Sequence, residues 1–331
     1  MINDRYKFIV YSVGIFFCYF YYGIIQEKIT RGRYGETKNE DGTKGERFTC
    51  ALAMVCVQCF CNALFAKGML LTKPQKDDTT PTSYYAVCSL TYLLAMVSSN
   101  MALRWVPYPT QVVGKSAKPI PVMILGVLLG RKSYSWTRYG CVLTIVAGVV
   151  LFMYKEGKVN PNMVQEKTGL GELLLLLSLA MDGLTGAVQE RMRSSSAPSG
   201  QQMMLSMNFW SSMMLGSAMI VTGEGKDFIL FASRHPQLLT HLATLALAGA
   251  LGQLFIFLMV AGFGPLACSV VTTTRKFFTV LFSVIFFGNL LIPRQWLGAV
   301  LVFAGLFADM VFGKKSQVKK PVAEDKKKLI S

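Results

Sequence analysis

Charged residues are scarce in this sequence. They make up 16% of its 331 residues, whereas soluble domains carry about 25%. Hydrophobic residues reach 52%, and the mean hydropathy is +0.42. This composition excludes an ordinary soluble domain and indicates an integral membrane protein.

Acidic residues and histidine are especially few. The chain has 18 Asp and Glu against 34 Lys and Arg, a formal charge of +16, and two histidines, His235 and His241, at one connection between apolar runs. Catalysis by acid–base chemistry or by a metal needs clustered carboxylates, histidines or cysteines. The sequence therefore argues against an enzyme and predicts no metal site and no cofactor. It also lacks the signs of a folded basic surface, so we expect no nucleic-acid partner.

Long apolar runs account for most of the chain. A bilayer needs about 20 apolar residues per helix, and ten windows approach this length. They lie at residues 8–26, 49–71, 84–103, 108–130, 138–154, 170–189, 203–222, 239–260, 266–288 and 294–312. The expected fold is therefore all-α and integral to the membrane, with ten transmembrane helices.

The connections between the windows are short, which leaves no room for an extramembrane catalytic domain. Lysines and arginines outside the windows are more numerous on the side that holds both chain ends. By the positive-inside rule this side is the cytosol. The lysine-rich residues 314–331 are expected to form a basic cytosolic tail.

The two halves of the sequence resemble each other. Lys118 aligns with Lys276 and Gly130 with Gly288 at one constant separation, and the stretch "YGIIQEK" matches "TGAVQER". Each half holds five windows, and because five is odd the second half enters the membrane from the opposite side. We therefore expect two inverted five-helix repeats, residues 1–160 and 161–313, as in many secondary transporters. Chance similarity between apolar helices is the alternative.

Four cations fall in the middle of apolar windows. Lys115 and Lys118 lie deep in the fourth window, and Arg275 and Lys276 reach a similar depth in the ninth. Each would cost at least about 2.5 to 3.5 kcal/mol if it faced lipid. They are expected to surround a cavity as uncompensated charges, and a ligand with several phosphates suits such a site. The alternative is that they only pair with Asp182, the one deep acidic residue, and with backbone carbonyls.

Other features of these windows fit a binding site. Pro119 and Pro121 are expected to break the fourth helix next to its lysines, and broken helices line the midplane sites of transporters. Polar side chains could hydrogen-bond the rest of the ligand, although hydrogen bonds between helices are an equal explanation. These candidates are Gln111, Thr273, Gln253 and Asn100.

The repeated "QEK" and "QER" stretches mark two further positions. Inverted topology places Glu27 and Lys28 near one membrane face and Glu190 and Arg191 near the other. Side chains at these positions could gate a central cavity. The alternative is that they are interfacial charges that end a helix.

Four longer stretches carry a resemblance to a known family. These are "QEKITRGRYGE", "MVSSNMALRWVPYPTQVVGKSAKPIPVM", "GELLLLLSLAMDGLTG" and "TTTRKFFTVL". They resemble the nucleotide-sugar transporter family of the drug/metabolite transporter superfamily, in particular its B subfamily, from Tyr6 to Gly313. The resemblance implies ten helices in two inverted halves. It also implies that Lys115, Lys118, Arg275 and Lys276 contact phosphates.

The resemblance further implies a function. A member of this kind exchanges cytosolic ATP for lumenal ADP across the endoplasmic reticulum membrane, as a multi-pass protein with both termini in the cytosol. The expected partners are nucleotides and the lipid bilayer. A UDP-sugar/UMP antiporter, with UDP-galactose as the sugar nucleotide, would use the same phosphate site and is the alternative that the sequence leaves open.

Overall fold

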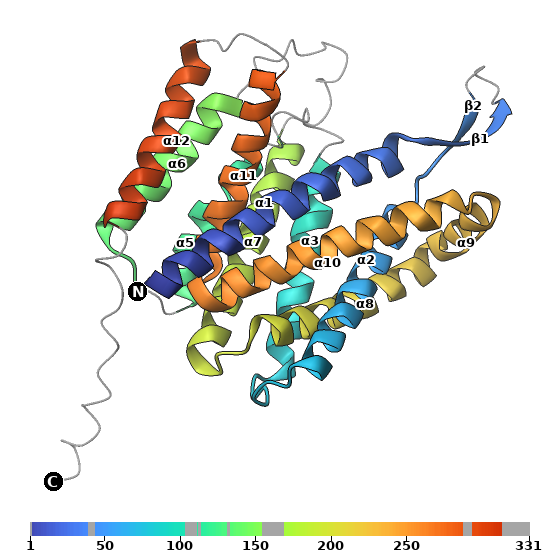
Figure 1. The fold of residues 1–331 in the computed structure, drawn as a ribbon, viewed down its shortest axis with the longest axis horizontal. Helices are drawn as coiled ribbons and strands as arrows, with labels where there is room; N and C mark the ends of the chain where they lie inside the picture. Colours follow the sequence, from blue (N-terminus) through green and yellow to red (C-terminus); the bar gives the residue numbers. More distant parts are fainter. Residues whose placement is uncertain are drawn as a thin grey trace.

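The computed structural model describes residues 2–38, 44–102, 111, 114–130, 133–153, 169–286 and 293–312, and nearly all of them are helical. The expected tail, residues 314–331, lies outside this set. The helices are α1 (Ile2–Arg31), α2 (Ala51–Thr72), α3 (Thr82–Ala102), α5 (Pro119–Leu128), α6 (Trp136–Met153), α7 (Leu170–Ser195), α8 (Gly200–Thr222), α9 (Glu224–Arg234), α10 (Gln237–Phe263), α11 (Pro265–Phe286) and α12 (Pro293–Phe312), arranged as in Figure 1.

Within the described residues, six helices are long and apolar enough to cross a membrane, namely α1, α2, α3, α7, α8 and α10, and α5, α6 and α12 contribute shorter apolar segments. Each of the ten predicted windows overlaps one described helix. The expectation of a helical, multi-span membrane protein is confirmed. The count of ten crossings stays a prediction.

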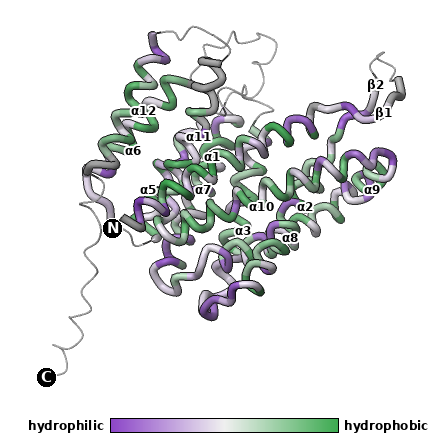
Figure 2. The backbone as a smooth tube through the Cα atoms, in the orientation of Figure 1, coloured by the Kyte–Doolittle hydropathy of each residue, from purple (hydrophilic) through white to green (hydrophobic). Residues whose placement is uncertain are grey.

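The outer surface of the bundle is apolar at mid-helix. Large side chains such as Phe17, Leu176 and Val300 are at least 60% exposed, and hydrophobic residues follow the middle of the long helices in Figure 2. Hydrophilic residues gather instead at the turns, at α9 and at the hairpin described next. This distribution suits a molecule surrounded by lipid, because apolar side chains there have no contact with water.

The all-helical expectation is wrong at one place. Strands β1 (Arg33–Lys38) and β2 (Lys44–Arg47) form an antiparallel hairpin at one end of the molecule. Tyr34 and Phe48 pack against Phe231 of α9 in a small apolar cluster, and Arg234 of α9 forms a 2.8 Å ion pair with Glu46 of β2. The same cluster includes residues of α1, α2 and α10, so the hairpin and α9 together pack on the ends of these long helices.

Helices from the two ends of the chain pack on each other. α1 packs along α10, α3 along α7, α2 on α8 and α6 on α12. Gly148 of α6 and Gly298 of α12 meet so closely that a Cβ on either would lie 2.8 Å from the carbonyl oxygen of the other. Small residues permit this kind of close backbone contact between membrane helices. The long-range pairing leaves α5, α7 and α11 around the interior that contains the cations.

Candidate functional site

A cavity lies between α1, α3, α5, α7, α8, α10 and α11. Its wall combines one lysine, one carboxylate, amides, hydroxyls and apolar side chains. The described lining residues include Tyr19, Tyr92, Lys118, Asp182, Gln189, Asn208, Gln253, Phe257, Cys268, Ser269 and Thr272. A polar pocket inside an apolar bundle is the expected place for a ligand site in a membrane protein.

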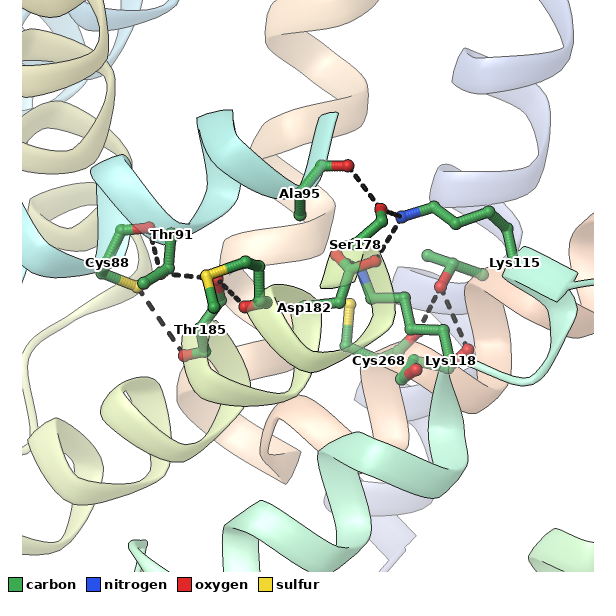
Figure 3. Close-up of polar contacts among 12 residues, drawn as sticks. Cys88, Thr91, Ala95, Lys115, Lys118, Ser178, Asp182, Thr185 and Cys268 are labelled. Carbon is green, nitrogen blue, oxygen red and sulfur yellow. Dashed lines mark hydrogen bonds and ion pairs between the residues drawn. The ribbon is translucent and has the colours of Figure 1, made fainter. Parts of the chain in front are cut away.

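Asp182 of α7 lies between two of the predicted cations. Its Oδ2 is 2.5 Å from the Nζ of Lys115, and its Oδ1 is 2.9 Å from the Nζ of Lys118. Figure 3 shows both lysines pointing at this carboxylate from the segment that precedes α5. The expectation of uncompensated charges is therefore wrong for Lys115 and Lys118. Pairing with Asp182 is the alternative that the sequence left open, and the structure shows it for both of these lysines.

A serine extends this cluster to a third helix. The Nζ of Lys115 also donates to the Oγ of Ser178 at 2.7 Å, and Ser178 donates to the carbonyl oxygen of Ala95 on α3 at 2.5 Å. Lys115 therefore has two partners, whereas Lys118 has only the carboxylate among the described residues. The side chain of Lys118 is 35% exposed, and that of Lys115 is 17% exposed.

The backbone next to the lysines is broken, as the prolines predict. Residues 114–116 are helical, residues 117–118 form a turn, and α5 begins at Pro119 with Lys118 as its N-cap. Proline is well suited to the first position of a helix, because the missing N–H has no helical partner there. Both lysine side chains next to this break reach the same carboxylate.

Close packing holds α5 on α7 beyond the ion pairs. A Cβ on Gly183 would lie 2.8 Å from the carbonyl oxygen of Pro121, and one on Gly186 would lie 2.9 Å from Val122. Both glycines follow Asp182 along α7. The ion pairs and the glycine contacts together fix α5 against this part of α7.

The cation of the other half meets an aromatic ring. The guanidinium of Arg275 on α11 lies 5.4 Å from the ring centroid of Tyr19, which lines the cavity. A cation at this distance from a ring is attracted by the charge distribution of the π system. The side chain of Lys276 lies outside the described part of the structure.

Buried amides form a network on the side of the cavity lined by α8 and α10. The Oε1 of Gln253 accepts from Asn208 at 2.7 Å and from Asn62 at 2.9 Å. Gln58 donates to Asn62 at 2.8 Å. Gln253 was predicted as a site residue and does line the cavity. Asn62 and Asn208 were missed, although a buried amide inside an apolar window is itself a signal of a polar interior.

The other predicted ligands lie elsewhere. Gln111 donates to the Oγ of Ser99 at 2.9 Å, which is the hydrogen bond between helical segments that the alternative reading proposed. Thr273 is buried beside the cavity residue Thr272, and Asn100 is exposed. None of Gln111, Thr273 and Asn100 is among the described lining residues of the cavity.

One predicted gate position is closed by an ion pair. Glu190 is buried and forms a 3.1 Å ion pair with Arg193. Arg193 also donates to the carbonyl oxygens of Ala261 and Gly262, at the end of α10, at 2.9 and 3.2 Å. The predicted gate residue Arg191 is exposed and lies 6.0 Å from the ring centroid of Tyr84. A role of Glu190 and Arg191 in gating stays a prediction.

A tyrosine hydroxyl lies near the ion pair between Glu190 and Arg193. Tyr134, in the segment before α6, is partly buried, and this burial, followed by the Glu190 carboxylate, raises the pKa of its hydroxyl above the usual value. Glu27 and Lys28, at the corresponding position of the first half, are both exposed. Among the described residues, no group of three or more metal-ligating side chains occurs.

Comparison with known proteins identifies the family. A protein from Drosophila melanogaster, the solute carrier family 35 member B1 homolog, is 71% identical over 98% of this chain and 96% of its own length. Solute carrier family 35 member B1 of Bos taurus is 53% identical over 95% of this chain and 96% of that one. A crystal structure at 8% identity has the same fold with a TM-score of 0.62, covering 92% of this chain and 97% of that one. The model of the UAA transporter family matches residues 7–313, and the chain accordingly belongs to this family of transporters.

Proposed function

We propose that the chain is a nucleotide antiporter that exchanges cytosolic ATP for lumenal ADP across the endoplasmic reticulum membrane. The charge around the cavity is the observation that carries the proposal. Lys115, Lys118 and Arg275 stand against the single carboxylate of Asp182 among the described groups at the site. A surplus of cations enclosed by apolar helices favours a ligand that brings several negative charges of its own.

The remainder of the cavity suits the uncharged part of a nucleotide. Asn208, Gln253 and Gln189 supply amide donors and acceptors, and Tyr19 and Tyr92 supply rings. A nucleobase presents a flat face and an edge of donors and acceptors, which rings and amides recognise together. We therefore assign Lys115, Lys118, Arg275 and Lys276 to the phosphates and Gln253 to the base or ribose.

A UDP-sugar/UMP antiporter remains the second candidate. It would use the same phosphate site, and amides can pair with the edge of uracil as readily as with that of adenine. The relatives are named only as solute carriers. ATP/ADP exchange is placed first because it is the activity that the family resemblance of the four sequence stretches implies, and the exchange experiment below decides between the two.

The helix packing supports alternating access by two inverted halves, residues 1–160 and 161–313. If the halves are related by a two-fold axis, α1 corresponds to α7, α2 to α8, α3 to α10 and α6 to α12. The observed contact between α1 and α10 then corresponds to the observed contact between α7 and α3. The α2–α8 and α6–α12 contacts each join two corresponding helices. A two-fold relation would produce this pattern, and rocking of such halves about a central site moves substrate. The positive-inside count places both termini in the cytosol.

The test is exchange by the purified protein in liposomes. Labelled ATP is offered outside, with ADP, UMP or no nucleotide inside and with UDP-galactose and UMP as external competitors in parallel. The proposal predicts fast uptake only with ADP inside and little competition from the uridine compounds. Uptake that requires UMP inside, with strong competition by UDP-galactose, would select the second candidate, and no exchange of either nucleotide would refute both.

A further inference from the structure

We propose that Asp182 is the resident counter-anion of the substrate site, which a substrate phosphate replaces on Lys118. The replacement weakens the attachment of α5 to α7, so that only the loaded carrier moves readily. This inference rests on the proposed nucleotide exchange, and it assigns a role to a residue that neither the charge pattern nor the family resemblance singled out as a ligand.

The geometry makes Lys118 the exchangeable partner. Asp182 uses one oxygen for each lysine, but Lys115 has Ser178 as a second partner and is the less exposed of the two. Lys118 lines the cavity and contacts only the carboxylate among the described residues. A phosphate that enters the cavity therefore reaches Lys118 first and competes with Asp182 for it (Figure 3).

Comparison of the two halves gives the second argument. The separation that aligns Glu27 with Glu190 also aligns Tyr19 with Asp182. At each of these two positions a cation from the helix of the other half is in contact: Lys118 at Asp182 and Arg275 at Tyr19. Arg275 directly precedes Lys276, the residue that aligns with Lys118, so the two contacts come from neighbouring positions of the repeat, and one is an ion pair whereas the other is a cation–ring contact. Separating a buried ion pair costs more free energy than separating a cation from an aromatic ring. The contact at Asp182 therefore holds its two helices together more strongly than the contact at Tyr19.

The helix packing is also tighter on the side of Asp182 than on the side of Tyr19. Gly186 of α7 is covered by Val122 of α5, whereas nothing among the described residues lies within 4 Å of a Cβ placed on Gly23, the aligned glycine of α1. α11 also touches α1 far less than α5 touches α7. The side with the carboxylate is therefore the closed side in the structure, as expected if Asp182 holds it closed when no anion is bound.

Strict exchange follows from this arrangement. Without substrate, Asp182 binds both lysines and keeps α5 on α7, so the empty carrier stays in one conformation. A nucleotide that takes Lys118 from Asp182 supplies the missing negative charge and releases the contact. Removing the carboxylate should have two effects: a tighter hold on the anion, and a carrier that no longer needs substrate to move.

The first experiment measures affinity. Asp182→Asn, wild type and Glu172→Gln, which alters an exposed carboxylate on the same helix, are purified, and their binding of ATP and ADP is measured by thermal shift in detergent. Because a competing charged hydrogen bond is lost, we expect the apparent Kd of Asp182→Asn to fall about tenfold. Glu172→Gln should match wild type, and Asp182→Glu should restore weaker binding. An unchanged or higher Kd in Asp182→Asn overturns the proposal.

The second experiment separates the contact from the charge. Asp182→Asn combined with Lys115→Gln keeps the net charge of this cluster at its natural value but removes the internal anion. In liposomes without internal nucleotide, wild type and Lys115→Gln should show no net uptake of the nucleotide that wild type exchanges, and the double variant should show uptake. Strict exchange by the double variant overturns the proposal.

The comparison of Lys115→Gln with the double variant also tests the proposal if Asp182→Asn alone fails to fold. The double variant adds no uncompensated charge, and its Kd should be lower than that of Lys115→Gln. If wild type itself exchanges no nucleotide, the proposed function fails. If wild type exchanges and these differences are absent, only the role of Asp182 fails.

Discussion

At the scale of single residues, two lysines three positions apart have different surroundings. Lys115 is held by Asp182 and Ser178 and is mostly buried, whereas Lys118 faces the cavity with one partner among the described residues. The sequence predicts the depth of both charges, because depth follows from the length of an apolar window. It could not predict this difference, which depends on side chains of α7 and α3.

The difference predicts separate effects of substitution. Lys118→Gln should raise the KM for nucleotide by about ten- to a hundredfold, since a charged hydrogen bond to phosphate is lost, and should change the melting temperature little. Lys115→Gln should lower the free energy of unfolding by about 1–3 kcal/mol through its two lost bonds. Exchange kinetics and thermal denaturation measure the two effects. Lys73→Gln, at an exposed position, is the control. A larger rise in KM for Lys115→Gln than for Lys118→Gln would contradict this division of roles.

At the scale of elements, local patterns predicted most of the helices and missed what depends on partners. Apolar length places the helices, and Pro119 locates the break in the fourth window. The hairpin was missed because its short polar strands have no alternating apolar pattern, and its stability comes from packing on α9. Arg193 could have been chosen over Arg191, because residues three apart on a helix share a face with Glu190 and adjacent ones do not.

The contact between α5 and α7 can be tested by a single methyl group. A Cβ on Gly183 would meet the backbone oxygen of Pro121 at 2.8 Å, so Gly183→Ala must move α5 away from α7. We expect a loss of about 1–3 kcal/mol in the free energy of unfolding, typical of overpacking, and weaker strict coupling of uptake to internal nucleotide. Gly23→Ala, at a glycine of α1 with open space among the described residues, should have neither effect. The idea fails if the two variants behave alike.

At the scale of the whole molecule, alternating access requires that each end of the cavity can be sealed in turn. In this structure charged hydrogen bonds join the helices at the end where α7 meets the turn between α10 and α11, which is the position predicted for a gate. Arg193 joins the buried Glu190 to the carbonyl oxygens of Ala261 and Gly262. The equivalent end of α1 carries Glu27 and Lys28 as exposed side chains. One end is therefore tied by charged hydrogen bonds of a buried carboxylate that cross between helices, and the charged side chains at the other end are exposed.

This asymmetry predicts that Arg193 controls turnover rather than binding. Arg193→Gln removes the cation from a buried carboxylate and frees the turn, so the closed conformation should lose stability and the exchange rate should fall by about tenfold or more, given the cost of breaking a charged hydrogen bond. The Kd for nucleotide should change little, because Arg193 lies outside the cavity lining. Arg191→Gln is the matched control, since it removes the same charge from the adjacent, exposed position. Exchange rates at saturating nucleotide measure turnover, and thermal-shift affinities measure binding. If Arg191→Gln lowers the exchange rate more than Arg193→Gln does, the gating residue is Arg191, as the sequence first indicated.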